Sequence, residues 1–284
     1  MIHRLRCAVR CGHDGPVEAI SAVLRLHPRA SLHQCVRARA LRVEPRPAVL
    51  REGTDHFGNP VAWLLFDRPH AGFEAVSESV VEVSVPAAPD PFATPAWEAV
   101  ARAGASADAL AHGAAEFVFG GPSAPAEAAA RAYAAASFPP GFPVLAGVLD
   151  LLGRVGRDDR GGHGHGAATP AGTDPRRGGA GVCRDQDLAR AMIAGLRGLG
   201  LPARHVSGCA RRGGEGRARA WVECWLGPRH GWLGLDPADD RVVGDGYVVL
   251  GRGRDAADVP PARVVPAGGG TCALAVEVGF EPGA

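Results

Sequence analysis

The sequence lacks a long apolar run, an appreciable net charge and any lysine. No stretch approaches the ~20 apolar residues that a membrane-spanning helix needs, and residues 1–7 lack the apolar run of a signal peptide. Lys+Arg is 31 and Asp+Glu is 30, so the formal charge of +1 creates no field that would gather nucleic acid or an anionic membrane. We therefore expect a cytoplasmic protein that binds neither nucleic acid nor membrane.

Metal-binding and disulfide patterns are also missing. The number of cysteines is odd, they are widely spaced, and no CxxC pair occurs: Cys7, Cys11, Cys35, Cys183, Cys209, Cys224 and Cys272. Zinc sites and disulfide frameworks usually show tighter spacing. An Asp/Asn-rich loop with calcium-ligand spacing is absent too. We expect no metal, no cofactor and no disulfide framework.

What the chain does contain is enough apolar sequence for a large core. It has 284 residues, of which 46% are hydrophobic. Apolar and polar residues alternate in short runs through residues 1–86, for example in Leu41–Glu44 and Val76–Val85, and period two indicates half-buried strands. Asp55–Pro60, between two such runs, carries the glycine, asparagine and proline of a chain reversal. Residues 1–86 are thus predicted to form an antiparallel β domain.

The composition then shifts to Pro, Ala and Gly. Residues 87–160 contain three helical stretches, Trp97–Val118, Ala124–Ala136 and Pro143–Val155. We interpret this part as a helical connector that packs on the third region, residues 161–284. That region alternates a helical segment with strand-like runs, which predicts an α+β fold.

The residues that could form a catalytic site lie between Gly181 and Asp236. The apolar residues after Cys183 fall near helical spacing, and Gly200–Pro202 closes the segment. Cys183 is therefore expected in the first turn of a helix, where unpaired backbone N–H groups and the helix dipole favour a thiolate. Ala203–Gly208, Ala220–Leu226 and Gly231–Pro237 follow as strands separated by turns.

Several motifs, in order, resemble the bacterial transglutaminase-like family. They are Arg42-Val43-Glu44-Pro45, Thr54-Asp55-His56-Phe57-Gly58-Asn59, Gly181-Val182-Cys183-Arg184-Asp185, Leu201 to Gly208, Ala220-Trp221-Val222-Glu223, Gly231-Trp232 to Asp236-Pro237, and Gly251 to Pro261. The resemblance implies an N-terminal β domain and a papain-like core in which the nucleophile helix packs on an antiparallel sheet. It also implies a protein or peptide substrate.

The same resemblance makes Cys183 the nucleophile and Asp236 the carboxylate that orients a general base. The base should be the residue directly before Ala220-Trp221, where this chain has Arg219. A guanidinium, with a pKa above ~12, cannot take up or give back a proton near neutrality. Gln186, Asp187 and Tyr247 depart from the family pattern as well, Tyr247 standing where a second histidine is expected.

Other residues could compensate. A cation beside Cys183 could still lower the pKa of the thiol. His205 and His230 flank the core strands and are candidate substitute bases, while Trp221 and Trp232 are candidate walls of a substrate cleft or core aromatics. Cys183 could also be a buried structural thiol, and Asp236 could simply begin a turn before Pro237.

Two functions remain open. The first is thiol-based amide hydrolysis or acyl transfer, impaired by Arg219. The second is a catalytically inactive transglutaminase-like fold that binds a peptide or protein. With no lysine, and only Gln34 and Gln186 as glutamines, the chain cannot polymerise itself through glutamyl-lysine bonds. The oligomeric state is not encoded in these patterns.

Overall fold

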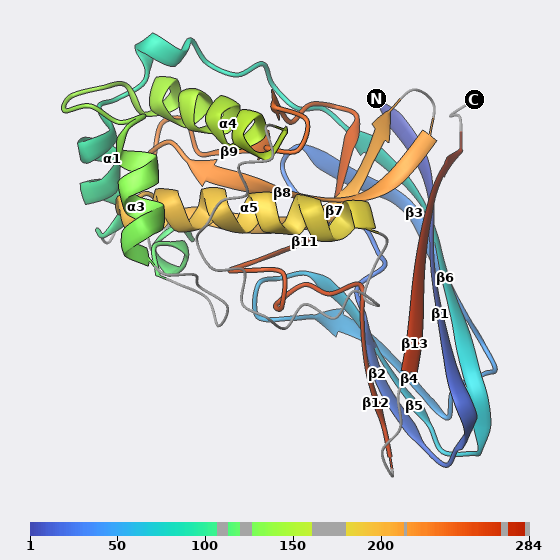
Figure 1. Cartoon of the computed structure of the whole chain (residues 1–284). Helices are drawn as coiled ribbons and strands as arrows, with labels where there is room; N and C mark the ends of the chain where they lie inside the picture. Colours follow the sequence, from blue (N-terminus) through green and yellow to red (C-terminus); the bar gives the residue numbers. More distant parts are fainter. Residues whose placement is uncertain (107–112, 120–126, 161–179, 213–214, 268–271, 282–284) are drawn as a thin grey trace.

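The computed structural model describes residues 1–106, 113–119, 127–160, 180–212, 215–267 and 272–281. The described chain forms two four-stranded sheets and one five-stranded sheet, with helices gathered at one end (Figure 1). The α+β prediction is confirmed. None of the helices in these ranges is long and apolar enough to cross a membrane.

The N-terminal region forms two antiparallel sheets. Their strands are β1 (Ile2–Val17), β2 (Ile20–Leu24), β3 (Gln34–Glu44), β4 (Val49–Thr54), β5 (Pro60–Phe66) and β6 (His70–Val83). The sheet orders are β13-β1-β6-β3 and β12-β2-β5-β4. Burial alternates along β6 and β2, so one face of each sheet is apolar. The two apolar faces pack on each other and form a sandwich with one core, which contains Leu5 and Val9 of β1, Ile20 of β2 and Leu64 of β5.

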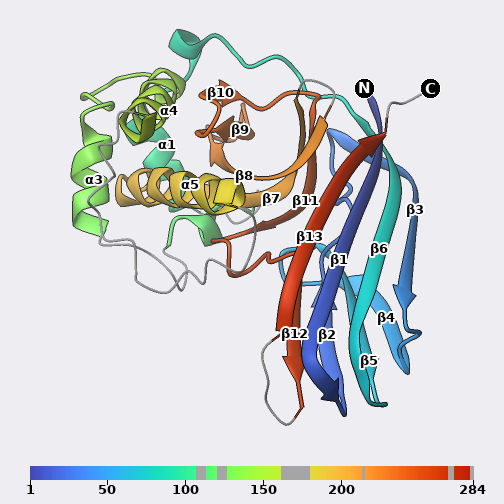
Figure 2. The same cartoon turned by 45° about the vertical axis from the view of Figure 1, so that its right-hand side comes forward.

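The chain's last strands belong to this sandwich. β12 (Ala262–Pro266) pairs with β2, and β13 (Cys272–Glu281) pairs with β1 along ten residues. Figure 2 shows β13 and β1 side by side over their length. Residues 161–284 were expected to form the core and a closing strand, and in the structure residues 262–266 and 272–281 pair with strands of the N-terminal sheets. Antiparallel partners far apart in the sequence carry no local signal of their pairing.

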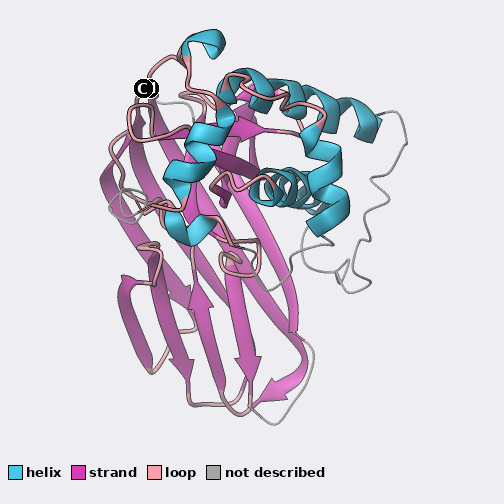
Figure 3. Ribbon diagram, turned by 90° about the vertical axis from the view of Figure 1, so that its left-hand side faces the viewer, coloured by secondary structure: helices cyan, strands magenta, loops and turns pink. Residues whose placement is uncertain are grey.

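The region between is mainly helical, as predicted. It contains the 3₁₀ turns η1 (Pro91–Ala93) and η2 (Ala115–Phe117) and the helices α1 (Trp97–Gly104), α3 (Glu127–Ala135) and α4 (Val144–Arg160). The first predicted helix ends at Gly104 rather than continuing to Val118, and the residues 107–112 of that prediction lie outside the described ranges. In Figure 3 the helices gather in the upper part of the molecule, beside the core strands.

The core sheet has the order β10-β9-β8-β7-β11. Its strands are β7 (Ala203–Arg212), β8 (Glu215–Trp225), β9 (Trp232–Asp236), β10 (Arg241–Val242) and β11 (Tyr247–Gly253). Helix α5 (Ala180–Gly198) packs on it through Leu188, Met192 and Leu196, which recur every four residues and are buried against Val222 and Leu235. Replacing Met192 by alanine would cost about 2–5 kcal/mol of stability.

A turn joins the sandwich to the core sheet. Asp55 accepts hydrogen bonds from the backbone N–H groups of Phe57 and Asn59, and Gly58 takes a φ of 73° that an L side chain rarely adopts. Asn59 is fully buried; its amide donates to the carbonyl of Arg252 in β11 and its Oδ1 accepts from the Arg252 N–H. The predicted reversal is confirmed, and it also fixes the start of β5 to β11.

One disulfide joins Cys11 of β1 to Cys272 of β13. No disulfide framework was expected from the sequence, and this bond corrects that expectation for one pair. The two cysteines are separated by 261 residues, and only the pairing of the first and last strands brings them together.

Candidate functional site

Helix α5 begins earlier than the sequence pattern indicated. Its first residue is Ala180, so residue 183 is the fourth of the helix and lies in the first turn, as expected for the nucleophile. The side chain of Cys183 lies outside the described part of the structure. Asp185 follows two residues later and is buried.

Arg219 of β8 is buried and holds three carboxylates. Its guanidinium contacts Asp185 at 2.8 Å, Asp236 at 3.1 Å and Asp239 at 2.6 Å. Strand β9 pairs with β8 only from Val222 onwards, so at Arg219 the strand has β7 as its partner on one side. The predicted approach of Arg219 to Asp236 is present, whereas the roles of Asp185 and Asp239 were missed.

Asp236 ends β9 and organises the turn that follows. One carboxylate oxygen accepts hydrogen bonds from the backbone N–H groups of Ala238 and Asp239. The other accepts from Arg219 and, at 2.8 Å, from the hydroxyl of Tyr247 in β11. Asp236 therefore starts a turn and also contacts the residue at the base position. Tyr247 stands where a second histidine was expected, and it donates a hydrogen bond to Asp236 through its hydroxyl.

The electrostatics of the site follow from this crowding. Burial alone would lower the pKa of Arg219, but Asp236, Asp185 and Asp239 together raise it above the usual value. The pKa of Asp185 is raised to about 6, first by burial and then by the other two carboxylates, although Arg219 opposes the shift. Burial and the neighbouring Asp236 raise the pKa of the Tyr247 hydroxyl. Arg219 is therefore permanently charged and no proton acceptor.

The charge balance also bears on the thiol. One guanidinium with three ionised carboxylates gives a formal 1 − 3 = −2 around the base position. A free cation near a cysteine would lower the thiol pKa, but here the positive charge is already neutralised by its partners. The N-terminal end of α5 is a feature that could favour a thiolate at residue 183.

The two candidate substitute bases do not join this site. His205 pairs in register with Val222, and since side chains alternate along a strand, it lies on the opposite face of the sheet from Arg219. Burial, Arg190 and Arg197 lower its pKa to about 3. His230 lies in the turn beyond Trp225, and six residues of extended strand, about 20 Å, separate Trp225 from Arg219. The sequence motifs placed neither residue.

The two tryptophans have different surroundings. Trp221 is fully buried and its ring meets that of Tyr247 edge-on, so it is a core aromatic and offers no surface to a substrate. Trp232 is half-buried; the guanidinium of Arg204 stacks 3.8 Å from its ring centroid. Of the predicted cleft pair, Trp232 alone retains accessible surface.

A second charged network stands near the other end of α5. Glu223 is buried between Arg204 and Arg252; burial would raise its pKa, but the two arginines hold it at about 2. Arg197 donates to the carbonyls of Phe117, Ala203 and Arg254. Twelve helical residues, about 18 Å, separate Arg197 from Asp185, so the two networks are distinct.

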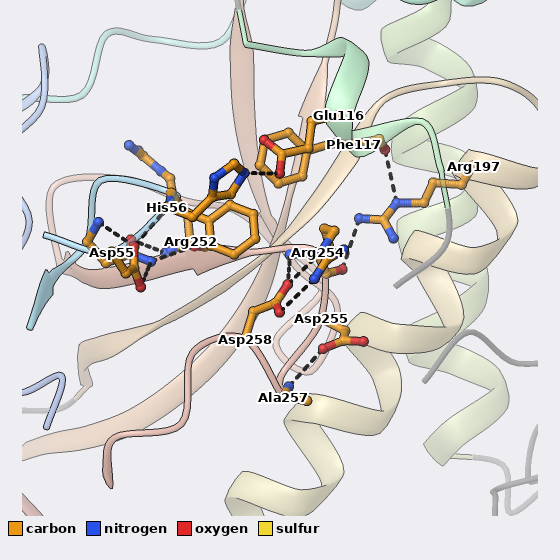
Figure 4. Close-up of polar contacts among 12 residues, drawn as sticks. Asp55, His56, Glu116, Phe117, Arg197, Arg252, Arg254, Asp255, Ala257 and Asp258 are labelled. Atoms are coloured by element: carbon orange, nitrogen blue, oxygen red, sulfur yellow. Dashed lines mark hydrogen bonds and ion pairs between the residues drawn. The ribbon is translucent and has the colours of Figure 1, made fainter. Parts of the chain in front are cut away.

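Figure 4 shows the segment beside this network, where Arg254 pairs with Asp258 and His56 with Glu116. A cavity of about 420 Å³ opens here between the sandwich and the core. Its lining includes Arg25, Asp55, Phe57, Trp63, Arg254 and Arg263. Neither Arg219 nor its carboxylates line it.

Comparison with known proteins gives a consistent assignment. Residues 6–82 match the bacterial transglutaminase-like N-terminal region, and residues 163–237 match the transglutaminase-like superfamily core. Uncharacterised proteins of Mycobacterium tuberculosis (strain ATCC 25618 / H37Rv) and Mycobacterium bovis are each 36% identical over 253 residues, which cover 84% of this chain and 79% of theirs. A crystal structure of a candidate cysteine protease from Cytophaga hutchinsonii shares the fold, with a TM-score of 0.69 at 17% identity over all of this chain and 92% of that one. The chain therefore belongs to the bacterial transglutaminase-like family, with that family's N-terminal region and core.

Proposed function

We propose that this chain is a transglutaminase-like protein that binds peptide or protein segments and has lost histidine-assisted amide hydrolysis. The observation that carries the proposal is the state of Arg219, which is buried and paired with Asp185, Asp236 and Asp239. Amide cleavage needs a group that takes the thiol proton and returns it to the departing amine. A guanidinium whose pKa is raised by three carboxylates does neither.

The direct test is a hydrolysis assay on a peptide amide. Wild type should show no release above that of the Cys183→Ala variant, because the site lacks a proton shuttle. Cleavage by wild type that disappears in Cys183→Ala would refute the loss of activity, since it would show that a base is present after all.

Binding is supported by the cavity between the sandwich and the core. It combines exposed aromatic surface on Trp63, 39% exposed, with charged groups from Arg254 and Arg263, a mixture that suits an extended polypeptide. Truncating a central interface tryptophan typically costs about 2 kcal/mol or more, which corresponds to about 30-fold in affinity. Trp63→Ala should therefore weaken binding of denatured casein, measured by fluorescence anisotropy.

Phe92→Ala is the matched control for that measurement, because Phe92 is 71% exposed on the connector and does not line the cavity. Equal affinities for the two variants would exclude the cavity as the binding surface. No measurable binding of casein by wild type would count against the binding role.

A second function, acyl transfer from activated esters, is favoured by the place of residue 183 in the first turn of α5. Activated esters release a leaving group that needs no proton, so the missing acid costs them least. Alkylation at neutral pH distinguishes the two functions. Cys35 is an exposed free thiol on β3 and provides an internal reference. Labelling of Cys183 faster than Cys35 would support acyl transfer, and slower labelling would support binding alone.

A further inference from the structure

Two cysteines and a histidine meet on the core-facing side of the β13-β1-β6-β3 sheet. Cys11 and His13 are two residues apart in β1, so their side chains share a face. The register of β1 and β13 places Cys272 directly opposite His13. The sulfur atoms of Cys11 and Cys272 and a ring nitrogen of His13 all lie within 4.8 Å of one another.

The separation between Cys11 and His13 suits a shared metal ion. Zinc binds thiolate sulfur at about 2.3 Å and imidazole nitrogen at about 2.0–2.1 Å, so two such ligands at a tetrahedral angle are about 3.6 Å apart. The distance between Cys11 Sγ and His13 Nε2 is 3.5 Å. Cys11 is buried, while His13 and Cys272 are half-buried, so the group is shielded from water yet reachable.

His70 at the start of β6 is placed to complete the set. Its ring centroid lies 6.5 Å from that of His13. Its Nδ1 donates to the carbonyl oxygen of Arg68 at 2.8 Å, which leaves the lone pair on Nε2. That Nε2 atom is buried and has no hydrogen-bond partner among the described residues. A buried, unpartnered ring nitrogen is available to bind a metal ion once the side chain turns toward the other three ligands.

We propose that Cys11, His13 and Cys272, with His70 as the fourth ligand, form a binding site for Zn²⁺ or a similar thiophilic divalent cation that is available when the disulfide is reduced. Two thiolates and two imidazoles form one of the ligand sets that zinc takes in structural sites. His70 reaches the shared ion by turning its side chain toward His13. Binding would keep β1 and β13 joined at the place where the disulfide joins them.

The disulfide and the metal site are alternative states of the same pair of sulfurs. A small thiol reductant supplies two electrons and two protons, so the bond between the two Sγ atoms breaks, two cysteine thiols form and two reductant molecules become one disulfide. Zn²⁺ then displaces both thiol protons to solvent as it binds the thiolates. All four ligands belong to the sandwich strands β1, β6 and β13, so the site is independent of Cys183 and of the function proposed above.

The test uses the full chain with its disulfide intact or reduced by a thiol and then freed of reductant under nitrogen. Reduced protein should take up one equivalent of Zn²⁺ in competition with a chromophoric chelator, and Co²⁺ in its place should give the visible absorption of a tetrahedral thiolate site. The oxidised protein should do neither. Zinc should also raise the melting temperature of the reduced protein alone, since a ligand that binds only the folded state stabilises it.

Variants assign the ligands. Cys272→Ser and His13→Asn should weaken Zn²⁺ binding by more than about tenfold, since changes outside the ligand set alone cost about 10- to 100-fold. Cys35→Ser and His33→Asn, at exposed positions, are the matched controls and should bind as wild type does. Should a cysteine variant fail to fold, His13→Asn and His70→Asn decide the matter alone, because they leave both sulfurs in place.

Three results would overturn the proposal. They are a reduced wild type that takes up no zinc, an oxidised protein that binds as tightly as the reduced one, and ligand variants whose affinity equals that of the control variants. Retention of binding by Cys183→Ser is also required. Its loss would move the ion to the core and away from the sandwich.

Discussion

Restoring histidine at position 219 tests the logic of the core site most sharply. Arg219 is 8% exposed and satisfies Asp185, Asp236 and Asp239 at once. Removing one partner from a buried ion pair costs about 3–5 kcal/mol, because the remaining charge stays buried. Arg219→Met should therefore lose stability on that scale, which is a large share of the 5–15 kcal/mol of a typical domain.

Arg219→His should behave differently in two respects. Three neighbouring carboxylates favour the imidazolium form, so the variant recovers part of the lost stability and melts between wild type and Arg219→Met. It also regains a group that exchanges protons. If the remaining geometry is intact, Cys183-dependent hydrolysis of a peptide amide should rise by about 10²–10⁴-fold over both wild type and Arg219→Met.

The assay follows amide cleavage by mass spectrometry, with an activated ester as a second substrate and Cys183→Ala in each background as the blank. A gain in amide cleavage without a comparable gain on the ester is expected, because the ester's leaving group needs no proton. Equal amide rates for Arg219→His and Arg219→Met would refute the view that the missing proton shuttle is the lesion. A Met variant as stable as wild type would refute the ion-pair reasoning.

Three further outcomes follow from the charges. Asp185 has a folded-state pKa of about 6, above that of an unfolded aspartate, so its contribution to stability is full below about pH 4 and is lost as the pH rises through 6. In urea unfolding, the free energy of unfolding of Asp185→Asn should therefore rise relative to that of wild type by up to about 3 kcal/mol between pH 4 and pH 7. The same pH dependence in both proteins would contradict this. Glu223 shows the opposite sign: its pKa of about 2 adds stability above pH 4.5 that is lost as the pH falls toward 2, so Glu223→Gln should cost about 3 kcal/mol at pH 7 and little at pH 2. Tyr247→Phe removes the hydroxyl that donates a hydrogen bond to Asp236 and should cost about 1.5–3 kcal/mol of stability in thermal unfolding. Tyr133→Phe is the control and should cost less, because the Tyr133 hydroxyl donates to Asp158 in a less buried setting. Equal losses for the two variants would show that burial does not strengthen the bond to Asp236.

The sequence was informative where a signal is local. Period-two runs identified strands in the N-terminal region, and the spacing after Cys183 identified the helix that became α5. The turn at Asp55–Asn59 was predicted from residue types whose backbone preferences require it. Family motifs then placed Arg219 beside Asp236, and the 3.1 Å contact agrees with that placement.

What the sequence concealed depends on long-range pairing. Nothing near Cys272 indicates that its strand lies against β1, so neither the disulfide nor the neighbouring His13 could be inferred. Asp185 was visible as part of the cysteine motif, but its contact with Arg219 depends on how the start of α5 meets the open edge of β8. Helical periodicity did offer one signal: Asp185 lies on the same stripe as Ala189 and Met192, which face the sheet.

The contacts of Arg219 show how a buried arginine can occupy this position without unfolding the site. A lone arginine in place of a histidine would be a buried charge without a partner and would cost several kcal/mol. Here Asp239 and Asp185 join Asp236 in surrounding the guanidinium, and Tyr247 satisfies the remaining lone pair of Asp236. The buried positive charge of the arginine is therefore compensated by a cluster of three carboxylates. The same contacts that stabilise the guanidinium keep its protons in place, so under the proposed function the stability of this site and its lack of proton transfer have one cause.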